Sequence, residues 1–297
     1  MKVKEDTLDM FYGTAFQHVA PFKTQLLKWI GNKQRFAHEI ATYFPTDVKT
    51  YFEPFLGSGA VLGAMQPPVA FASDVFGPLV EIWKTLASDP EKLVQWYSAR
   101  YKEYFSLEKP EGYERIKARY NSMPNGADLL FLCRSCYGGV VRFRKADGHM
   151  STPCGAHTPI TPTSFAERVQ IWHRRTSGAT FAKLDFSEAM GQAKQGDLIY
   201  CDPPYKHSQT ILYQGQGFEL ARLMQEIAAC KDRGVRVALS IDGEKKSGLV
   251  KCHLDIPEGL FEREVLISCG RSMLRRFQRE GESLEDDVVL DRLLLTY

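Results

Sequence analysis

Asp197-Leu198-Ile199-Tyr200-Cys201-Asp202-Pro203-Pro204-Tyr205 is the stretch that constrains the fold most strongly. Its short apolar run is typical of a buried central strand in an α/β sheet. The strand must end at Asp202, because neither proline has an N–H to donate to a sheet ladder. Proline also holds the preceding residue extended. The sequence therefore predicts a carboxylate, a backbone carbonyl and an aromatic ring at the carboxyl edge of the sheet, where open α/β sheets bind ligands.

These groups suit chemistry on the exocyclic amino group of a flat base. The Asp202 carboxylate and the Pro203 carbonyl are two acceptors for the two amino hydrogens, and together they would direct the nitrogen lone pair at an incoming methyl group. Tyr205 would stack on the base, a contact worth roughly 1–3 kcal/mol. A plain strand-to-loop turn has the same residue pattern, so this motif alone leaves both interpretations open.

A second strand runs into a glycine turn at Phe52-Glu53-Pro54-Phe55-Leu56-Gly57-Ser58-Gly59. Glycines let the backbone approach a ligand closely, and a helix follows. Leu62 stands where the dinucleotide fingerprint has its third glycine, which favours a smaller nucleoside over a pyrophosphate cofactor. Asp74 ends the next apolar strand, in the position of an acceptor for ribose hydroxyls.

The segment Lys28-Trp29-Ile30-Gly31-Asn32-Lys33 lies upstream of these strands, before an amphipathic helix expected at residues 35–43. Its Gly-Asn pair marks a turn that would leave Trp29 and Lys33 facing a common space. Trp29 fits a core position equally well.

Composition places the chain among ordinary globular proteins. Its 297 residues are 44% hydrophobic and 25% charged, with no repeat or low-complexity tract. No apolar run reaches the length of about 18 residues that a membrane helix needs, and the N-terminus does not resemble a signal peptide. Seven cysteines without a framework spacing indicate reduced thiols in a cytoplasm.

Strand and helix patterns alternate on both sides of a segment with a different character. Residues 89–178 carry helical stretches at 91–104 and 113–121, and residues 86–180 hold 14 Lys+Arg against 9 Asp+Glu in a chain with a net charge of +2. We therefore predict an α/β domain at residues 1–88 and 179–297, with a Rossmann-like sheet covered by helices on both faces. Residues 89–178 would be an inserted, mostly helical domain that binds phosphate.

The strongest DNA-binding candidate lies inside this insert. Arg134, Arg142, Arg144 and Lys145 occur within twelve residues with no acid among them. Val141 and Phe143 alternate with the arginines, and Asp147-Gly148 would turn this strand into a β-hairpin. Arginine binds phosphate or guanine in bidentate fashion, although a solvated hairpin fits the pattern too. A second basic run, at residues 270–277, is another candidate for phosphate contact.

Three cysteines and a histidine in the same segment offer a zinc site as an alternative. Cys133-x-x-Cys136 followed by Cys154-x-x-His157 has zinc-ligand spacing. Cys133 ends an apolar helical run, where a buried thiol is the more common outcome. We therefore predict no metal.

Taken together, the motifs resemble the D12-class, Dam-like (alpha-group) adenine-N6 DNA methyltransferases. Lys28-Trp29 with Lys33, residues 52–59, Asp74, Asp185-Phe186 and residues 202–205 come in that family's order and span nearly the whole chain.

The resemblance implies an S-adenosylmethionine-dependent enzyme that methylates the N6 amino group of an adenine flipped out of double-stranded DNA. The implied cofactor-binding residues are Trp29, Lys33, Phe55, Gly57, Ser58, Gly59, Asp74, Asp185, Phe186 and Asp202. The implied catalytic residues are Asp202, Pro203, Pro204 and Tyr205. The expected DNA contacts are Arg134, Tyr137, Arg142, Arg144 and Lys145, joined by Arg271 and Arg275 of the second basic run. We further expect a cytoplasmic monomer from a bacterium, an archaeon or a phage, in a modification system that can include a restriction endonuclease.

Three rival functions stay open at this point. Cytosine N4 or an RNA adenine is an alternative target, although a serine in place of Asp202 would be more typical for cytosine. A DNA-binding regulator could keep the fold without the reaction. A metal-stabilised nucleic-acid adaptor would use the spacing between Cys133 and His157.

Overall fold

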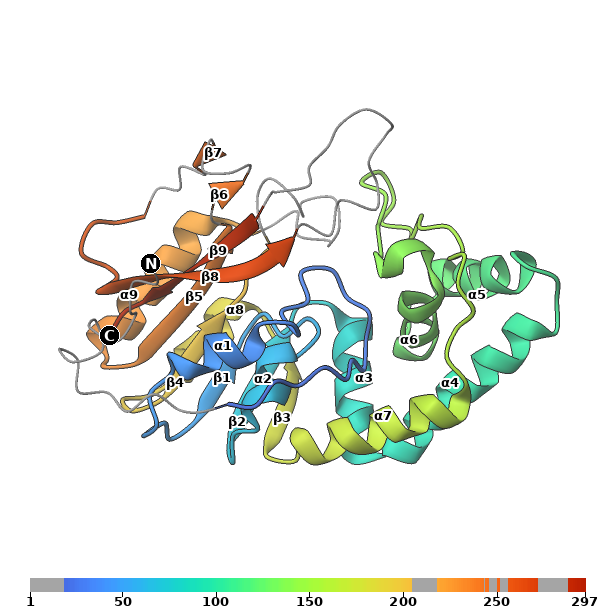
Figure 1. The fold of residues 1–297 in the computed structure, drawn as a ribbon, viewed down its shortest axis with the longest axis horizontal. Coiled ribbons are helices and arrows are strands. Elements are labelled where there is room, and N and C mark those ends of the chain that lie inside the picture. Colours follow the sequence, from blue (N-terminus) through green and yellow to red (C-terminus); the bar gives the residue numbers. More distant parts are fainter. Residues whose placement is uncertain (1–18, 205–217, 243, 246–249, 252–255, 272–287) are drawn as a thin grey trace, which may run out of the picture.

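A seven-stranded sheet forms the centre of the protein (Figure 1). The structure is a computed structural model that describes residues 19–204, 218–242, 244–245, 250–251, 256–271 and 288–297. In these residues the strand order is β3-β2-β1-β4-β5-β9-β8. The strands are β1 (Tyr51–Glu53), β2 (Ala70–Asp74), β3 (Ala179–Lys183), β4 (Leu198–Cys201), β5 (Arg236–Asp242), β8 (Arg263–Arg271) and β9 (Val288–Leu295), beside a separate pair, β6 (Glu244–Lys245) and β7 (Val250–Lys251).

The order of the strands reverses beside β1. The five neighbouring strands β3, β2, β1, β4 and β5 are mutually parallel, whereas β9 runs antiparallel to both β5 and β8. The chain leaves β1 toward β2 and β3 and later returns to the other side of β1 with β4. This reversal is a topological switch point, where the carboxyl ends of parallel strands open a crevice for a ligand.

Helices cover both faces of the sheet, as the sequence predicted. Alternation along the strands sends Phe52, Ile199 and Cys201 into a core under α8 (Phe186–Gly191) and α9 (Leu220–Asp232). Tyr51, Leu198 and Tyr200 point into a core on the opposite face. The helices of that face are α1 (Ala37–Thr42), α2 (Ala60–Met65) and α3 (Gly77–Ser88). The sheet is therefore buried on both sides, which explains its nearly continuous apolar strands.

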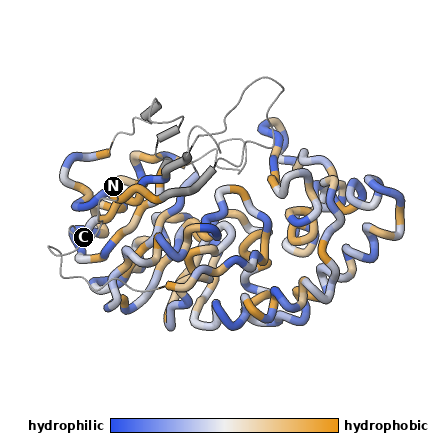
Figure 2. The backbone as a smooth tube through the Cα atoms, viewed as in Figure 1, coloured by the Kyte–Doolittle hydropathy of each residue, from blue (hydrophilic) through white to orange (hydrophobic). Residues whose placement is uncertain are grey.

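A helical segment continues this core beyond the edge strand β3 (Figure 1). It contains α4 (Pro90–Phe105), α5 (Glu111–Ser122), α6 (Gly126–Ser135), the short 3₁₀ helix η3 (Tyr137–Gly139) and α7 (Pro162–Arg175). Capping side chains define three helix starts: Asp89 accepts from the Lys92 N–H, Asn125 from the Asp128 N–H and Thr161 from the Ser164 N–H. Figure 2 shows hydrophobic stretches in both the sheet and this segment, and hydrophilic stretches in peripheral loops.

Aromatic rings join the segment together and to the sheet layer. Tyr97 of α4 stacks on Phe165 of α7 with ring centroids 4.2 Å apart. Trp172 of α7 lies edge-on to Trp83 of α3 at 5.5 Å. No helix in the described part of the chain is both long and apolar enough to span a bilayer.

Candidate active site

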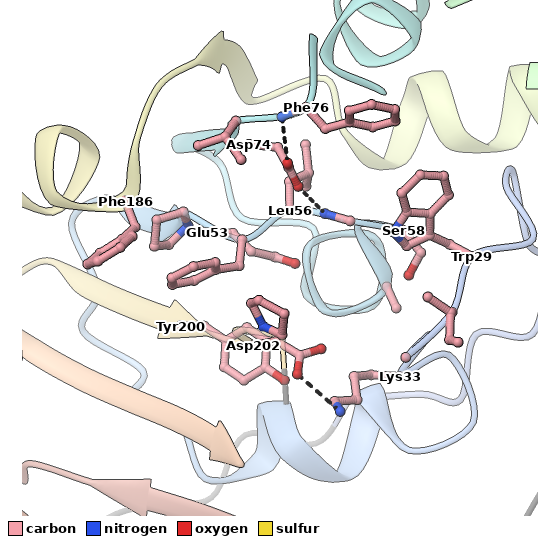
Figure 3. A pocket seen from close by; sticks show the side chains of 18 of the residues that line it. Trp29, Lys33, Glu53, Leu56, Ser58, Asp74, Phe76, Phe186, Tyr200 and Asp202 are labelled. Carbon is pink, nitrogen blue, oxygen red and sulfur yellow. Dashed lines mark hydrogen bonds and ion pairs between the residues drawn. The ribbon is translucent and has the colours of Figure 1, made fainter. Parts of the chain in front are cut away.

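A cavity of about 360 Å³ opens at the switch point between β1 and β4 (Figure 3). Phe186 and Trp29 stand on opposite sides of it, with Asp74 near one edge and Asp202 and Lys33 near another. The predicted cofactor residues on its wall are Trp29, Lys33, Phe55, Gly57, Ser58, Asp74, Asp185, Phe186 and Asp202. Volumes of this size are usual for sites that take small ligands.

The glycine turn is held in its shape by backbone dihedrals and by Asp74. Gly57 and Gly59 have φ values of 47° and 60°, which favour glycine. A Cβ on Gly59 would lie 2.9 Å from the Trp83 ring, so Gly59 supports the wall of the cavity from behind. Asp74 accepts hydrogen bonds from the N–H groups of Gly57 (3.1 Å) and Phe76 (3.0 Å). Asp74 therefore orients the turn, and a carboxylate still has lone pairs left for a ligand.

Aromatic rings form one end of the cavity. Phe55 stacks on Phe186 with centroids 5.2 Å apart, and Phe218 meets Phe55 edge-on at 5.8 Å. Asp185 caps α8 by accepting from the Ser187 N–H, and it also forms an ion pair with Arg222 at 2.5 Å. The Arg222 guanidinium lies 4.7 Å from the Phe186 ring centroid. Sequence reasoning missed Phe218 and Arg222, which belong to no motif.

A buried lysine stands between two carboxylates near the other end. Lys33 Nζ lies 3.1 Å from Asp202 Oδ1 and 3.1 Å from Asp291 Oδ2. Burial alone lowers the pKa of Lys33, but the carboxylates of Asp202 and Asp291 more than offset this effect and raise its pKa above the usual value. The ammonium is therefore charged at neutral pH and fixes the direction of Asp202.

Glu53 is a fourth carboxyl group on the cavity wall, beside those of Asp74, Asp185 and Asp202, and it lies at the carboxyl end of β1. It is 3% exposed and accepts hydrogen bonds from the Tyr51 hydroxyl (2.7 Å) and the Leu62 N–H (3.1 Å). Burial raises the pKa of Glu53 to about 8, and the charge of Asp202 acts in the same direction. Burial thus favours the protonated form of Glu53 at neutral pH.

The Asp-Pro-Pro stretch leaves the sheet where the sequence predicted. Strand β4 ends at Cys201, and Asp202 and Pro204 both lie on the cavity wall. Tyr200, one residue before the strand end, also lines the cavity and donates its hydroxyl to Ser240 Oγ at 2.9 Å. Tyr205, the fourth predicted catalytic residue, lies outside the described residues.

The structure corrects the role of one predicted DNA contact. Arg134 is 8% exposed and donates to the carbonyls of Gln25 (3.1 Å) and Leu26 (2.7 Å). It also lies over the Phe165 ring. Its guanidinium therefore ties α6 to the N-terminal segment, because carbonyls buried there need donors. Arg134 is a structural residue, not a DNA-facing one.

The remaining basic residues of the segment lie on the surface. Tyr137, Arg142, Arg144 and Lys145 are exposed, and Arg144 forms an ion pair with Asp147 at 2.5 Å. The predicted β-hairpin is reduced to a single bridge between Phe143 and Met150. Two further backbone hydrogen bonds join the two sides: the Arg144 N–H donates to the His149 carbonyl, and the Ser151 N–H donates to the Arg142 carbonyl. Arg271 ends strand β8, and Arg275 lies outside the described residues.

Phe143, between the two exposed arginines, turns inward. It lies on the cavity wall and meets the Phe76 ring edge-on at 5.5 Å. Phe76 in turn lies 6.1 Å from Trp29. The loop expected to read DNA is therefore packed against the pocket that the motifs assign to the cofactor, an arrangement that the alternating sequence pattern did not reveal.

The cysteines with zinc-ligand spacing make contacts within the protein. The Cys133 thiol donates to the Leu130 carbonyl, and Cys136 pairs with Cys154 in an isolated bridge of the backbone. Burial raises the pKa of Cys133 to about 11 and that of Cys136 to about 12. Among the residues that the structure describes, no group of three or more His, Cys, Asp or Glu side chains is arranged to hold a metal ion.

Comparisons with known proteins agree with these motifs. The "DNA N-6-adenine-methyltransferase" of Escherichia phage P1 is 28% identical over 237 residues, covering 75% of this chain and 30% of the phage protein. The "Retron Ec67 DNA adenine methylase" of Escherichia coli is 31% identical over 188 residues, covering 61% of this chain and 63% of the retron protein. This chain thus spans less than two thirds of the length of either relative.

One solved structure that matches this chain is the rRNA methyltransferase aviRa from Streptomyces viridochromogenes, with a TM-score of 0.36 and 11% identity over 88% of this chain and 83% of that one. So distant a likeness says nothing about function. The family model of the D12 class N6 adenine-specific DNA methyltransferases matches residues 29–251. Since that match covers well over half of the sequence, the chain belongs to the D12 class of N6 adenine-specific DNA methyltransferases.

Proposed function

We propose that this protein transfers a methyl group from S-adenosylmethionine to the N6 amino group of adenine in double-stranded DNA. The observation that carries the proposal is the placement of Asp202. Its carboxylate lies on the cavity wall at the sheet's switch point and is oriented by the buried Lys33 ammonium at 3.1 Å. Family membership supports the same reaction.

The residues of the cavity fit S-adenosylmethionine. Aromatic rings and carboxylates attract a sulfonium cation, and Trp29, Phe55 and Phe186 share the wall with Asp74 and Asp202. The turn from Gly57 to Gly59 leaves the backbone open to a close ligand, because a glycine has no Cβ. We assign the nucleoside to the side of Asp74, Asp185 and Phe186, and the reacting centre to the side of Asp202.

When bound, the donor supplies an activated methyl whose bond electrons stay on sulfur, while the adenine nitrogen forms the new N–C bond and then loses one proton to water. The work left to the protein is positioning and electrostatics. Asp202 and the Pro203 carbonyl accept the two amino hydrogens and stabilise the positive charge that develops on the nitrogen. Pro204 lies on the cavity wall with Asp202, and Tyr205 would stack on the base.

The charge states of the carboxyl groups support this division of roles. Glu53 is neutral at pH 7 because burial raises its pKa to about 8. Asp202 remains ionised in our proposal, since it faces the charged Lys33. Two neighbouring carboxyl groups held in different charge states are typical of sites that run acid–base or charge-stabilising chemistry at neutral pH.

DNA would enter from the side of the helical segment, residues 89–178, which we propose as the target-recognition domain. The exposed residues Tyr137, Arg142, Arg144 and Lys145 would contact the duplex, and Arg271 and Arg275 would contact phosphate. The target adenine must leave the base stack to reach Asp202, because its amino group is paired inside the duplex. We further propose a monomer that acts on DNA in a cytoplasm and can be paired with a restriction endonuclease.

The test is methylation of plasmid DNA from a host that lacks adenine methylation, with S-adenosylmethionine as the donor. Single-molecule sequencing should reveal N6-methyladenine at a fixed sequence, and Asp202→Ala should abolish it. Nucleoside analysis that finds N4-methylcytosine, or methylation of RNA only, would refute the proposal. Absence of S-adenosylmethionine binding in calorimetry would instead identify a regulator that keeps the fold without the reaction.

A further inference from the structure

Asp291 is a buried carboxylate that none of the recognised motifs contains. It lies on β9, outside the stretch that the family model matches. Its side chain is 10% exposed, and its Oδ2 accepts a hydrogen bond from Lys33 Nζ at 3.1 Å. The two residues are 258 positions apart, so only the insertion of β9 between β5 and β8 brings them together.

The position of Asp291 matters because of the charges around the reacting nitrogen. Methyl transfer moves a positive charge from sulfur to the amino nitrogen, so a nearby ammonium opposes the reaction and a nearby carboxylate favours it. Lys33 is such an ammonium, 5% exposed and in contact with Asp202. With Asp202 as its only partner, Lys33 would neutralise the group that has to stabilise the product charge.

Asp291 changes this balance. Lys33 Nζ is equally distant from Asp202 and Asp291, at 3.1 Å from each. One ammonium is thus shared by two carboxylates, and the three groups together keep one negative charge. Glu53 adds little to this charge at neutral pH, because burial favours its protonated form.

We propose that Asp291 is a positioning residue for methyl transfer: it shares the Lys33 ammonium with Asp202, so that the ammonium neutralises Asp202 only in part and negative charge on Asp202 stays available to the target nitrogen. The inference rests on the proposed function and adds a residue from the end of the chain to its active site. It predicts an effect on the chemical step and none on recognition of the methyl donor.

The first experiment measures methyl transfer by Asp291→Asn in a single turnover, with tritiated S-adenosylmethionine and unmethylated plasmid DNA. We expect the rate constant to fall by about tenfold or more, while the Kd for S-adenosylmethionine stays within twofold. Glu264→Gln is the matched control, because it removes a carboxylate from the neighbouring strand β8, where Glu264 pairs with Arg292. That control should transfer methyl at the wild-type rate.

A double-mutant cycle then separates positioning from a merely structural role. If Asp291 acts through Lys33, Asp291→Asn should cause no further loss in a Lys33→Met background. Should Asp291→Asn fail to fold, Asp291→Glu takes its place, with a reduced rate in the wild-type background and no reduction in Lys33→Met.

Three outcomes would overturn the inference: a wild-type rate in Asp291→Asn, losses that multiply in the double variant, or a defect confined to donor affinity. A wild-type protein that methylates no adenine would instead refute the proposed function, so the two failures are distinguishable.

Discussion

The buried carboxyl group of Glu53 should make the free energy of unfolding depend on pH. Its side chain is buried beside Tyr51 and Leu62, and burial raises its pKa from 4.5 to about 8. Between these two pH values the unfolded chain releases the proton of Glu53 while the folded protein keeps it. Stability that is present below pH 4.5 is therefore lost as the pH rises toward 8.

The size of the effect follows from the difference between the two pKa values. Each unit corresponds to about 1.4 kcal/mol, so Glu53 should lower the free energy of unfolding by on the order of 4–5 kcal/mol at pH 8 and above. Glu53→Gln removes the titration and keeps an acceptor for the Tyr51 hydroxyl and the Leu62 N–H. We expect its stability advantage over wild type to be about 1 kcal/mol at pH 5 and to grow to several kcal/mol at pH 8.

Urea unfolding followed by far-ultraviolet circular dichroism at a series of pH values from 5 to 8.5 measures this difference. Comparing the variant with wild type cancels every other titrating group, and the exposed Glu188→Gln serves as the control with no pH-dependent gain. Parallel stability curves for Glu53→Gln and wild type would refute the reasoning. Glu53 would then be ionised in the folded protein, and the cavity would hold a second negative charge beside Asp202.

Three further predictions concern the reaction and its partners. Asp202→Asn should slow single-turnover methyl transfer by about 10²–10³, whereas Asp197→Asn, at the opposite end of β4, should keep the wild-type rate, because Asp197 only accepts backbone hydrogen bonds there. Phe143→Ala should raise the Kd for S-adenosylmethionine measured by calorimetry without DNA; an unchanged Kd would show that the loop does not support the pocket. Arg142→Ala or Arg144→Ala should flatten the salt dependence of DNA binding by about one unit if the lost contact is to phosphate, or relax the mapped methylation sequence if it is to a base; a variant that does neither argues against a DNA contact.

Much of the site was predictable from local patterns. An apolar run that ends at Asp202-Pro203 must be a strand that stops there, because proline cannot continue the ladder. Gly57 and Gly59 predicted a turn after β1, and their positive φ values in the structure are ones that glycine adopts readily. Parallel strands gather their carboxyl ends at one edge, so the sequence already predicted that the acids at those ends would meet.

Other features depend on contacts between distant parts of the chain. The sequence did not show that Arg134 is buried, because its partners are carbonyls more than 100 residues away. Nor did it show that Phe143 faces the cavity, because Phe76 and Trp29 come from other elements.

Asp291 is the clearest example of what only the tertiary structure decided. Its strand could be predicted from its apolar neighbours, but strand order is set by the packing of the whole sheet and not by local pattern. Placing β9 antiparallel beside β5 carries Asp291 to Lys33. The sequence thus determined which residues end the parallel strands and form the glycine turn. The three-dimensional fold decided which buried charges share a partner, since burial and Coulomb interaction depend on distances that the linear order of residues does not contain.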